Sequence, residues 1–308
     1  MHRTISISLP AGCTAPLVAR LQPHPDIISL SLDRGGSLKP VGDVLTLHLL
    51  NRGGNDVLRQ VAEVCGNNPY TLTTAELASL VSPAQQEHIE QDFDEALWEE
   101  MESGLSHNGR LTSNYMYLMS IGGLVAAVGL VAEPVPQAMS FVAAAVLAPG
   151  FDPLAKVSLG MLHGKKMLIV KGLQNTLLGY TVLIISAAIS FWIMQFTGAA
   201  TVKDFVTNHE VLAMTHPDAK QLLMSVGGAL AGGLMVASYR ETFITGALMA
   251  MAVIHAAAMV GVGLATGQWF FAGQGAQRFG LDALLIVGCC WLVFWGKQQF
   301  VHHRKPLV

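Results

Sequence analysis

An acidic residue and a histidine stand in strongly apolar surroundings in the second half of the chain. Asp152 lies in AVLAPGFDPLAK, residues 145–156, and His255 lies in GALMAMAVIHAAAMVGVGLATG, residues 246–267. Burial disfavours either charge alone, whereas a partner of opposite charge favours it. Ionisable groups within a membrane are functional candidates by default. A carboxylate beside an imidazole would form a proton relay or a cation site.

The stretch around Asp152 opposes a continuous helix. Gly150 and Asp152 lie between Pro149 and Pro153, and proline removes a backbone hydrogen-bond donor. The carbonyl groups before this break lose their helical partners, which is tolerated at membrane depth only where protein or water satisfies them. We therefore expect a cavity at the break. Asp152 followed by Pro153 also fits an N-cap and the first residue of a half-helix over 154–162, so capping alone is the other interpretation.

Asn175, on the next apolar segment, is the remaining polar residue of the candidate site. Its amide either bonds across helices or contacts an ion or solute, and His255 alone fits a packed, hydrogen-bonded histidine equally. The candidate ion or solute site is Asp152, His255, Pro149, Gly150, Pro153 and Asn175. We expect no catalytic residue, cofactor or metal, because the chain lacks nucleophile–base pairs and known catalytic motifs, and its four cysteines lack metal-type spacing.

Apolar segments long enough to cross a bilayer must position these residues. The 308-residue chain is 52% hydrophobic and 13% charged, against roughly 25% charge in soluble proteins. Its net charge of -3, without a basic cluster, excludes a nucleic-acid partner. The expected segments of a polytopic α-helical membrane domain over 110–308 are about 114–132, 136–162 with a break, 167–196, 221–238, 242–266 and 281–300.

Two blocks of this domain recur in the same order. LMSIGGLVAAVGLVA at 118–132 resembles LMSVGGALAGGLMVA at 223–237, and VSLGMLHG at 157–164 resembles VGVGLATG at 260–267. Such recurrence indicates a duplication. The other interpretation is that runs of glycine and alanine arise in any close-packed helical bundle.

The duplication predicts how the two copies cross the membrane. Each copy, about 114–196 and about 221–300, carries three spans, so the second runs in the opposite direction, as in many secondary transporters. The blocks at 157 and 260 are 103 residues apart, which makes Asp152 equivalent to His255. We expect the two side chains to meet near the midplane.

The first 81 residues predict a cytoplasmic α+β domain. Strand alternation covers 3–9, 26–32, 43–50 and 71–77, and helical spacing covers 14–22 and 55–65. The resulting βαββαβ order is that of a ferredoxin-like split βαβ unit.

Residues 82–109 predict one acidic amphipathic linker helix that begins at Ser82-Pro83. Its apolar stripe would pack on the α+β domain or on a neighbouring subunit, or the helix would be a solvated linker.

The membrane part resembles the prokaryotic family called domain of unknown function 389 (DUF389). The similarity covers about 110–300 and rests on the SIGGL-type opening, the proline-bracketed AP-x-x-x-P and the two glycine-ended blocks. Many members carry a similar small α/β domain in front. The resemblance implies this architecture but no activity. The family's usual apolar residues between the prolines and its Pro-Pro pair in the second copy are replaced here by Gly150 to Asp152 and by His255-Ala256.

Charge predicts the orientation. Lysine and arginine fall mainly on one side of the segments, with Lys203, Lys220 and Arg278 on the other. By the positive-inside rule both termini are cytoplasmic, at the inner membrane, and no cleavable signal is evident. We expect a transporter or channel for an ion or small solute, in contact with the lipid bilayer and as a homo-oligomer. The alternative is a membrane-anchored sensor or scaffold whose cytoplasmic domain binds a ligand or partner.

Overall fold

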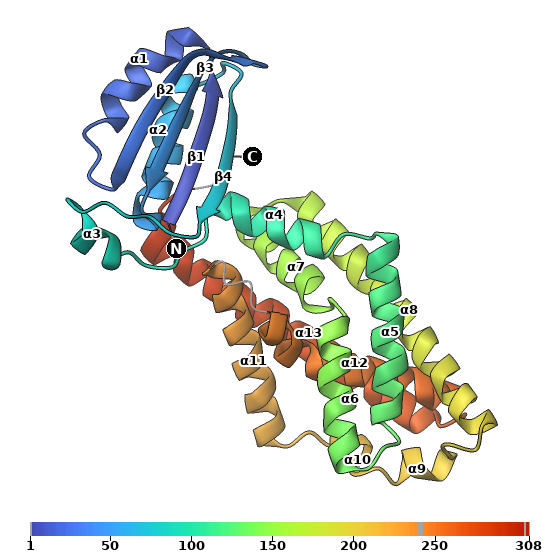
Figure 1. Ribbon diagram of the computed structural model, residues 1–308. Helices are drawn as coiled ribbons and strands as arrows, with labels where there is room; N and C mark the ends of the chain where they lie inside the picture. Colours follow the sequence, from blue (N-terminus) through green and yellow to red (C-terminus); the bar gives the residue numbers. More distant parts are fainter. Residues whose placement is uncertain (1, 239–242, 305, 308) are drawn as a thin grey trace. The chain divides into compact units, whose positions relative to one another are not determined.

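A computed structural model describes residues 2–238, 243–304 and 306–307, with the backbone alone described for 243–252. The chain divides into two compact units (Figure 1). We call Met1–Met101 with Phe300–Val308 the sheet unit, and Glu102–Gln299 the helical unit.

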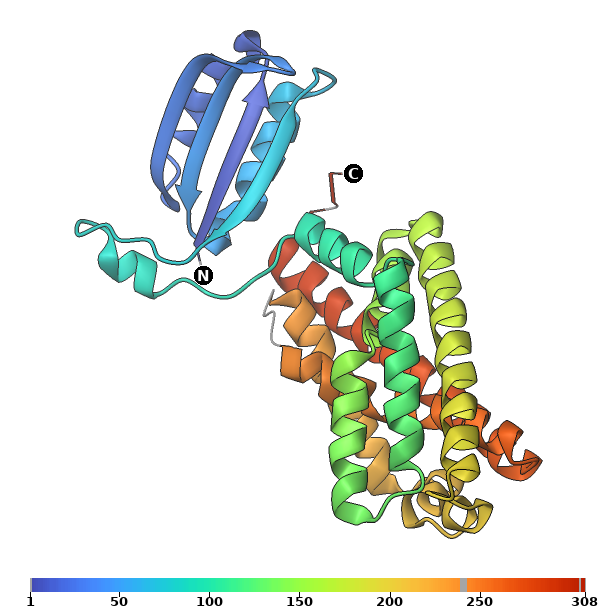
Figure 2. The same cartoon turned by 45° about the vertical axis from the view of Figure 1, so that its right-hand side comes forward.

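The sheet unit has the predicted βαββαβ order. Its elements are β1 (His2–Leu9), α1 (Ala11–Leu21), β2 (Ile27–Leu38), β3 (Val41–Leu49), α2 (Gly54–Cys65) and β4 (Thr71–Leu77). The strands lie in the order β2-β3-β1-β4, and each neighbouring pair is antiparallel (Figure 2).

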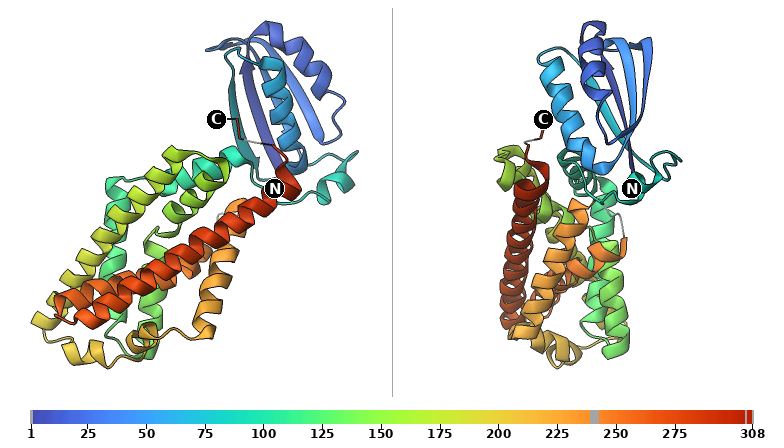
Figure 3. Two further views of the ribbon diagram at one scale, coloured as in Figure 1. Left: turned by 180° about the vertical axis from the view of Figure 1, so that it is seen from behind. Right: turned by 90° about the vertical axis from the view of Figure 1, so that its left-hand side faces the viewer.

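Strand alternation places the core of this unit on one face of the sheet. Ile5, Ile7 and Leu9 of β1 are buried while their neighbours are partly exposed, as expected for a strand with one covered face. Helices α1 and α2 cover that face (Figure 3), and they contribute Leu17 and Val61 to the same core.

The single linker helix predicted for 82–109 is wrong. Two shorter helices, α3 (Gln86–Glu90) and α4 (Trp98–Asn108), lie there instead. The intervening backbone bonds to other parts of the unit, because Asn51 donates to the Phe93 carbonyl at 2.9 Å and Arg3 donates to the Glu95 carbonyl. These tertiary hydrogen bonds take the place of helical ones. Leu97, from the predicted apolar stripe, joins the core of the sheet unit.

The C-terminal segment also belongs to the sheet unit. Both terminal nitrogens of Arg304 donate to the Glu99 carboxylate, at 2.8 and 2.6 Å, and the Leu307 amide donates to the same group at 2.8 Å. Burial opposes ionisation of Glu99, but these hydrogen bonds and the charge of Arg304 outweigh it and lower the pKa of the carboxyl. Arg304 and Leu307 are thereby held beside the start of α4.

The helical unit contains most of the apolar segments that the sequence predicts. After α4 come α5 (Ser113–Gly129), α6 (Pro134–Leu147), α7 (Phe151–His163), α8 (Lys166–Phe196), α9 (Val202–Val206), α10 (His209–Thr215), α11 (Ala219–Ala237), α12 (Phe243–Ala265) and α13 (Trp269–Lys297). Within the described part, three helices are long and apolar enough to span a membrane, or up to five if each bent pair is one span. Helix α5 packs against α8, and α11 packs against α13 (Figures 2 and 3).

One expected feature of these segments is present and one is wrong. The break in 136–162 lies between α6 and α7, which are bent by 51°. The stretch 269–280, which lies between the predicted segments 242–266 and 281–300, is instead part of α13. Gly275 in this stretch lets α13 approach α12, since a methyl group there would lie 2.9 Å from the Ala256 carbonyl. The glycines therefore serve close helix packing, and Arg278 lies inside a helix rather than in a flanking loop.

The ends of α7 and α12 are built alike, 103 residues apart. Gly164 and Gly267 both adopt left-handed backbone angles, with φ of 68° and 70°. The Lys165 amide donates to the Gly160 carbonyl at 2.9 Å, and the Gln268 amide donates to the Gly263 carbonyl at 2.8 Å.

The packing between helices repeats with the same spacing. Gly172 of α8 faces the Pro153 carbonyl of α7 as Gly275 of α13 faces the Ala256 carbonyl of α12. The spacing of 103 residues also relates contacts between the two predicted copies. Ser158 of α7 donates to a carbonyl of α13, and Gly261 of α12 lies against the equivalent carbonyl of α8.

Candidate functional site

Asp152 lies in the first turn of α7 and is half-buried. Gly150 is the N-cap residue, and no side chain caps this helix start, so the capping role considered for Asp152 is wrong. Pro153 fits inside the first turn because the amide that it lacks would have no helical partner there. The Asp152 carboxylate has no hydrogen bond to any residue that the structure describes.

The break itself is packed against α8. Gly150 is buried, and a side chain at this position would collide with the hydroxyl of Tyr180. Pro149 is half-buried within the break. The Gly150 amide donates to the Ala148 carbonyl at 2.8 Å, which satisfies one of the carbonyl groups expected to lose its partner.

Tyr180 directs an unpaired hydroxyl at this break. Its side chain is 2% exposed, and the hydroxyl has no hydrogen-bond partner among the described residues. The ring packs edge-on against Phe279 of α13, with centroids 4.7 Å apart. A buried hydroxyl without a hydrogen-bond partner is uncommon in proteins.

A buried ion pair on α13 lies close to Tyr180. Arg278 and Asp282 are 6% and 1% exposed, and Arg278 Nε donates to the Asp282 carboxylate at 2.8 Å. Arg278 Nη2 donates to Ser225 of α11 at 2.9 Å, and Asp282 is within electrostatic reach of Tyr180. Arg278 Nη1 and Asp282 Oδ1 have no partner among the described residues. We call Tyr180, Arg278 and Asp282 the polar centre.

The sequence interpretation missed all three members of the polar centre. Arg278 and Asp282 are four residues apart, the spacing of neighbours on one helix face. The predicted segment began at 281, which placed Arg278 outside the helix that contains Asp282. Tyr180 carries no comparable signal, because its unpaired hydroxyl becomes evident only when its surroundings are known.

His255 is buried on α12, and its ring stacks on Phe141 of α6 with centroids 3.6 Å apart. Its Nε2 atom has no partner among the described residues. No hydrogen bond or ion pair joins His255 to Asp152 in that part of the chain. Their predicted meeting therefore stays a prediction.

Asn175 bonds to backbone beyond its own helix. The side-chain amide of Asn175 donates to the Gly109 carbonyl. The backbone carbonyl of Asn175 accepts a hydrogen bond from the Tyr115 hydroxyl at 3.4 Å. These contacts join α8 to the segment that leads into α5 and to α5 itself. The structure thus supplies the cross-helix role considered for Asn175, and its amide nitrogen is already engaged.

Comparison with protein families identifies one segment. The family described as Domain of unknown function (DUF389) matches residues 145–287. Residues 145–287 are a DUF389 segment. No curated protein and no solved structure matches the chain.

The DUF389 segment runs from the end of α6 to the middle of α13. It therefore contains the break, the whole polar centre and His255. The family's description carries no activity, so any function of these residues has to be derived from their chemistry.

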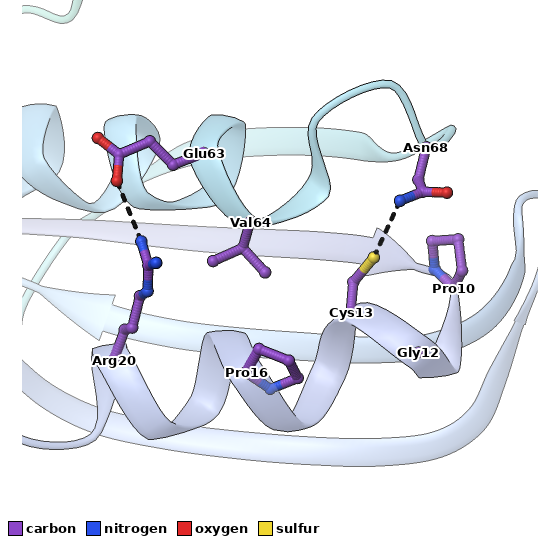
Figure 4. Close-up of a pocket in the computed structure, with 8 residues that line it drawn as sticks. All are labelled: Pro10, Gly12, Cys13, Pro16, Arg20, Glu63, Val64 and Asn68. Atoms are coloured by element: carbon purple, nitrogen blue, oxygen red, sulfur yellow. Dashed lines mark hydrogen bonds and ion pairs between the residues drawn. The ribbon is translucent and has the colours of Figure 1, made fainter.

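A pocket of about 520 Å³ lies outside the DUF389 segment, between α1 and α2 of the sheet unit (Figure 4). Its polar groups already have partners, since Arg20 pairs with Glu63 at 3.0 Å and Asn68 contacts the Cys13 sulfur at 3.6 Å. Burial and the neighbouring Cys13 raise the pKa of the Cys65 thiol to about 11. The thiol therefore stays protonated near neutral pH, which does not suit a metal ligand. The described residues contain no group of metal-binding side chains.

Proposed function

We propose that the helical unit carries an ion or small solute across the inner membrane, with its site where the break between α6 and α7 meets α8 and α13. The observation that carries this proposal is the polar centre. Tyr180, Arg278 and Asp282 each bury an atom without a partner among the described residues. An unsatisfied buried polar group costs about 1–3 kcal/mol, and a ligand or water in transit would satisfy all three.

The recurring contacts support two copies of one three-span unit. Three features recur 103 residues apart: the glycines that end α7 and α12, the glycines at which α8 and α13 approach these helices, and the contacts between the two predicted copies. Copies with an odd number of spans run in opposite directions, and transporters of this plan bind substrate where the copies meet. Tyr180 belongs to the first predicted copy and Arg278 with Asp282 to the second, so the polar centre has the composition expected of such an interface.

The segments before and after the helical unit both belong to the sheet unit, which favours an even number of membrane crossings. The chain leaves the sheet unit after Met101 and returns to it at Phe300, and Arg304 pairs with Glu99 within that unit. Both ends of the helical unit would then lie on one side of the membrane. Six spans, with α12 added to the five candidates and both termini cytoplasmic, satisfy this condition.

The alternative proposal is a membrane-anchored sensor or scaffold. The pocket between α1 and α2 favours it, because a ligand could bind there without any path through the helices. Such a ligand would have to displace the Arg20–Glu63 pair, which is about half exposed and easily opened.

Flux measurements on the full chain in proteoliposomes test the transport proposal. We expect wild type to carry at least one member of a panel of ions and small solutes, and Tyr180→Phe to reduce that flux at least tenfold. The thermal unfolding midpoint should be retained, because the hydroxyl has no partner to lose. Tyr117→Phe is the matched control, since Tyr117 is 67% exposed on α5.

Equal flux in wild type and Tyr180→Phe would refute this site. No flux for any member of the panel would refute transport and leave the sensor.

A further inference from the structure

Two thiols of the sheet unit lie together where the first turn of α1 meets the end of α2. Cys13 is in that first turn, and Cys65 is the last residue of α2. Both belong to the same apolar core. We propose that Cys13 and Cys65 form a modification site, at which a small-molecule disulfide oxidises the two thiols to a reversible disulfide bond.

Two sets of contacts bring these cysteines together. A side-chain hydrogen bond joins the Cys65 thiol to the Cys13 thiol. The side-chain amide of Asn68 donates both to the Cys13 sulfur, at 3.6 Å, and to the Cys65 backbone carbonyl, at 2.9 Å. A disulfide brings its sulfurs to about 2 Å from each other, so thiols that are already in hydrogen-bond contact have only a small distance to close.

Access distinguishes the two thiols. Cys13 is 7% exposed and lines the pocket of about 520 Å³ between α1 and α2, where it faces Asn68 (Figure 4). Cys65 is 1% exposed and is not among the residues that line this pocket. A pocket of several hundred Å³ admits a small molecule. Cys13 is therefore the thiol that a small disulfide reaches first.

The oxidation balances with glutathione disulfide as the oxidant. The Cys13 sulfur attacks one sulfur of glutathione disulfide, which forms a mixed disulfide and releases one glutathione thiol with the proton of Cys13. The Cys65 sulfur then attacks the Cys13 sulfur, which closes the protein disulfide and releases the second glutathione thiol with the proton of Cys65. The two cysteines lose two electrons, and glutathione disulfide gains them.

The surroundings of each sulfur suit its step. The Asn68 amide and the first turn of α1 stabilise negative charge on the Cys13 sulfur as it attacks. Burial raises the pKa of the Cys65 thiol to about 11, so Cys65 is a poor nucleophile toward molecules in solution near neutral pH. Its contact with Cys13 compensates, because reacting groups that are held together have a high effective concentration.

The rival interpretation is that both cysteines serve only as small apolar core residues. An apolar core residue needs neither the Asn68 donor nor a place on a pocket, so these two features favour the modification site. Disulfides of cytosolic proteins are usually transient and redox-sensing, which suits the cytoplasmic location proposed for both termini. The bond would tie α1 to α2, and it is independent of transport by the helical unit.

Mass spectrometry of the full chain in detergent tests the site. The reduced protein is exposed to glutathione disulfide, and the remaining free thiols are then alkylated. We expect wild type to lose two hydrogen atoms, and peptide mapping to find Cys13 joined to Cys65 without retained glutathione. An excess of reduced glutathione should restore both thiols.

Single variants separate the two steps. Cys65→Ser should retain one glutathione on Cys13, because no second thiol can close the bond. Cys13→Ser should react at least tenfold more slowly at Cys65, which is not reached from the pocket. The matched control is the double variant Cys289→Ala with Cys290→Ala, which removes the thiols of α13 and should react as wild type. Hydrogen exchange of the β1 amides checks that the sheet unit of each variant is folded.

Three results would overturn the proposal. Wild type that forms no bond between Cys13 and Cys65 in excess glutathione disulfide would do so, and this measurement needs no variant. Glutathione that stays on Cys13 in wild type would show that Cys65 is not the second thiol. Equal rates in wild type and Cys13→Ser would show that Cys13 is not attacked first.

Discussion

Two buried arginines, one in each unit, face opposite situations. Arg3 of the sheet unit is 2% exposed, and all three of its side-chain nitrogens donate, to Asn51, Glu100 and the Glu95 carbonyl. Arg278 of the helical unit is 6% exposed, and its Nη1 has no partner among the described residues.

Arg3 has a structural role, because all of its side-chain nitrogens are bonded, whereas Arg278 keeps a nitrogen that could bind a further group. A buried charge is tolerated when hydrogen bonds and a counter-charge surround it, and Arg3 meets that condition within its own unit. Arg278 meets it in part, and its neighbours Tyr180 and Asp282 each leave an atom unsatisfied as well. Arg3 thus uses its charge for stability within the sheet unit, whereas Arg278 and its neighbours retain unused hydrogen-bonding atoms in the helical unit.

The largest expected effect tests the structural side of the comparison. Arg3→Leu leaves the Glu100 carboxylate buried without its partner, so we expect a loss of about 3–5 kcal/mol in the stability of the sheet unit. Hydrogen exchange of the β1 and β3 amides in the full chain measures this loss.

Arg20→Gln is the control for Arg3→Leu. The Arg20–Glu63 pair is about half exposed on both sides, and its loss should change stability by less than about 1 kcal/mol. A similar loss for both variants would contradict the structural role of Arg3.

A smaller effect is expected at the break. Gly150→Ala places a methyl group against the Tyr180 hydroxyl, and overpacking of this kind costs about 1–3 kcal/mol. Thermal unfolding of the full chain measures it, and the cost should fall in the Tyr180→Phe background, where the nearest atom is removed. The two substitutions should therefore be non-additive.

Gly288→Ala is the matched glycine control on α13, since nothing among the described residues lies within 4 Å of an added methyl group there. Additive effects of Gly150→Ala and Tyr180→Phe would show that the Tyr180 hydroxyl does not pack against Gly150.

The smallest expected effect concerns the C-terminal segment and depends on pH. The pKa of Glu99 is lowered in the folded state, so its contribution is fully present above its ordinary value of about 4.5 and is lost as the pH falls through the folded pKa. Hydrogen exchange of residues 300–307 should rise as the pH falls below about 4.5, after correction for intrinsic exchange rates. In Glu99→Gln this segment should exchange faster at neutral pH and lack the transition.

Glu63→Gln, at an exposed pair, should retain the transition in the C-terminal segment. A wild-type transition that persists in Glu99→Gln would show that another group fastens this segment.

Much of the fold follows from local sequence patterns. Alternation in β1 and helical spacing in α2 are local signals, and the predicted elements of the sheet unit lie within a few residues of the observed ones, except that β2 continues six residues beyond its predicted end, to Leu38. The break before α7 was also predictable, because Pro149 and Pro153 act on the backbone wherever they occur. The linker was not, because its backbone hydrogen bonds go to distant residues such as Asn51 and Arg3.

The candidate site was predictable only in part. Asp152 and the break were evident as polar and helix-breaking residues in apolar sequence. Asn175 was evident as well, but whether its amide meets a solute or the Gly109 carbonyl depends on a residue 66 positions away. Tyr180 and Arg278 were missed because the first looks ordinary in sequence and the second lies among glycines.

The sequence by itself determined the apolar segments, the strand and helix periods, the break and the similarity between the blocks at 118–132 and 223–237, since each depends on residues close together in the chain or on direct similarity between segments. Only the tertiary structure decided which polar groups are satisfied. Glycines in α8 and α13 let these helices approach their neighbours, and that packing leaves Tyr180, Arg278 and Asp282 buried with unused hydrogen-bonding atoms among the described residues. Hydrogen bonding depends on distance in space, which spacing along the chain does not fix.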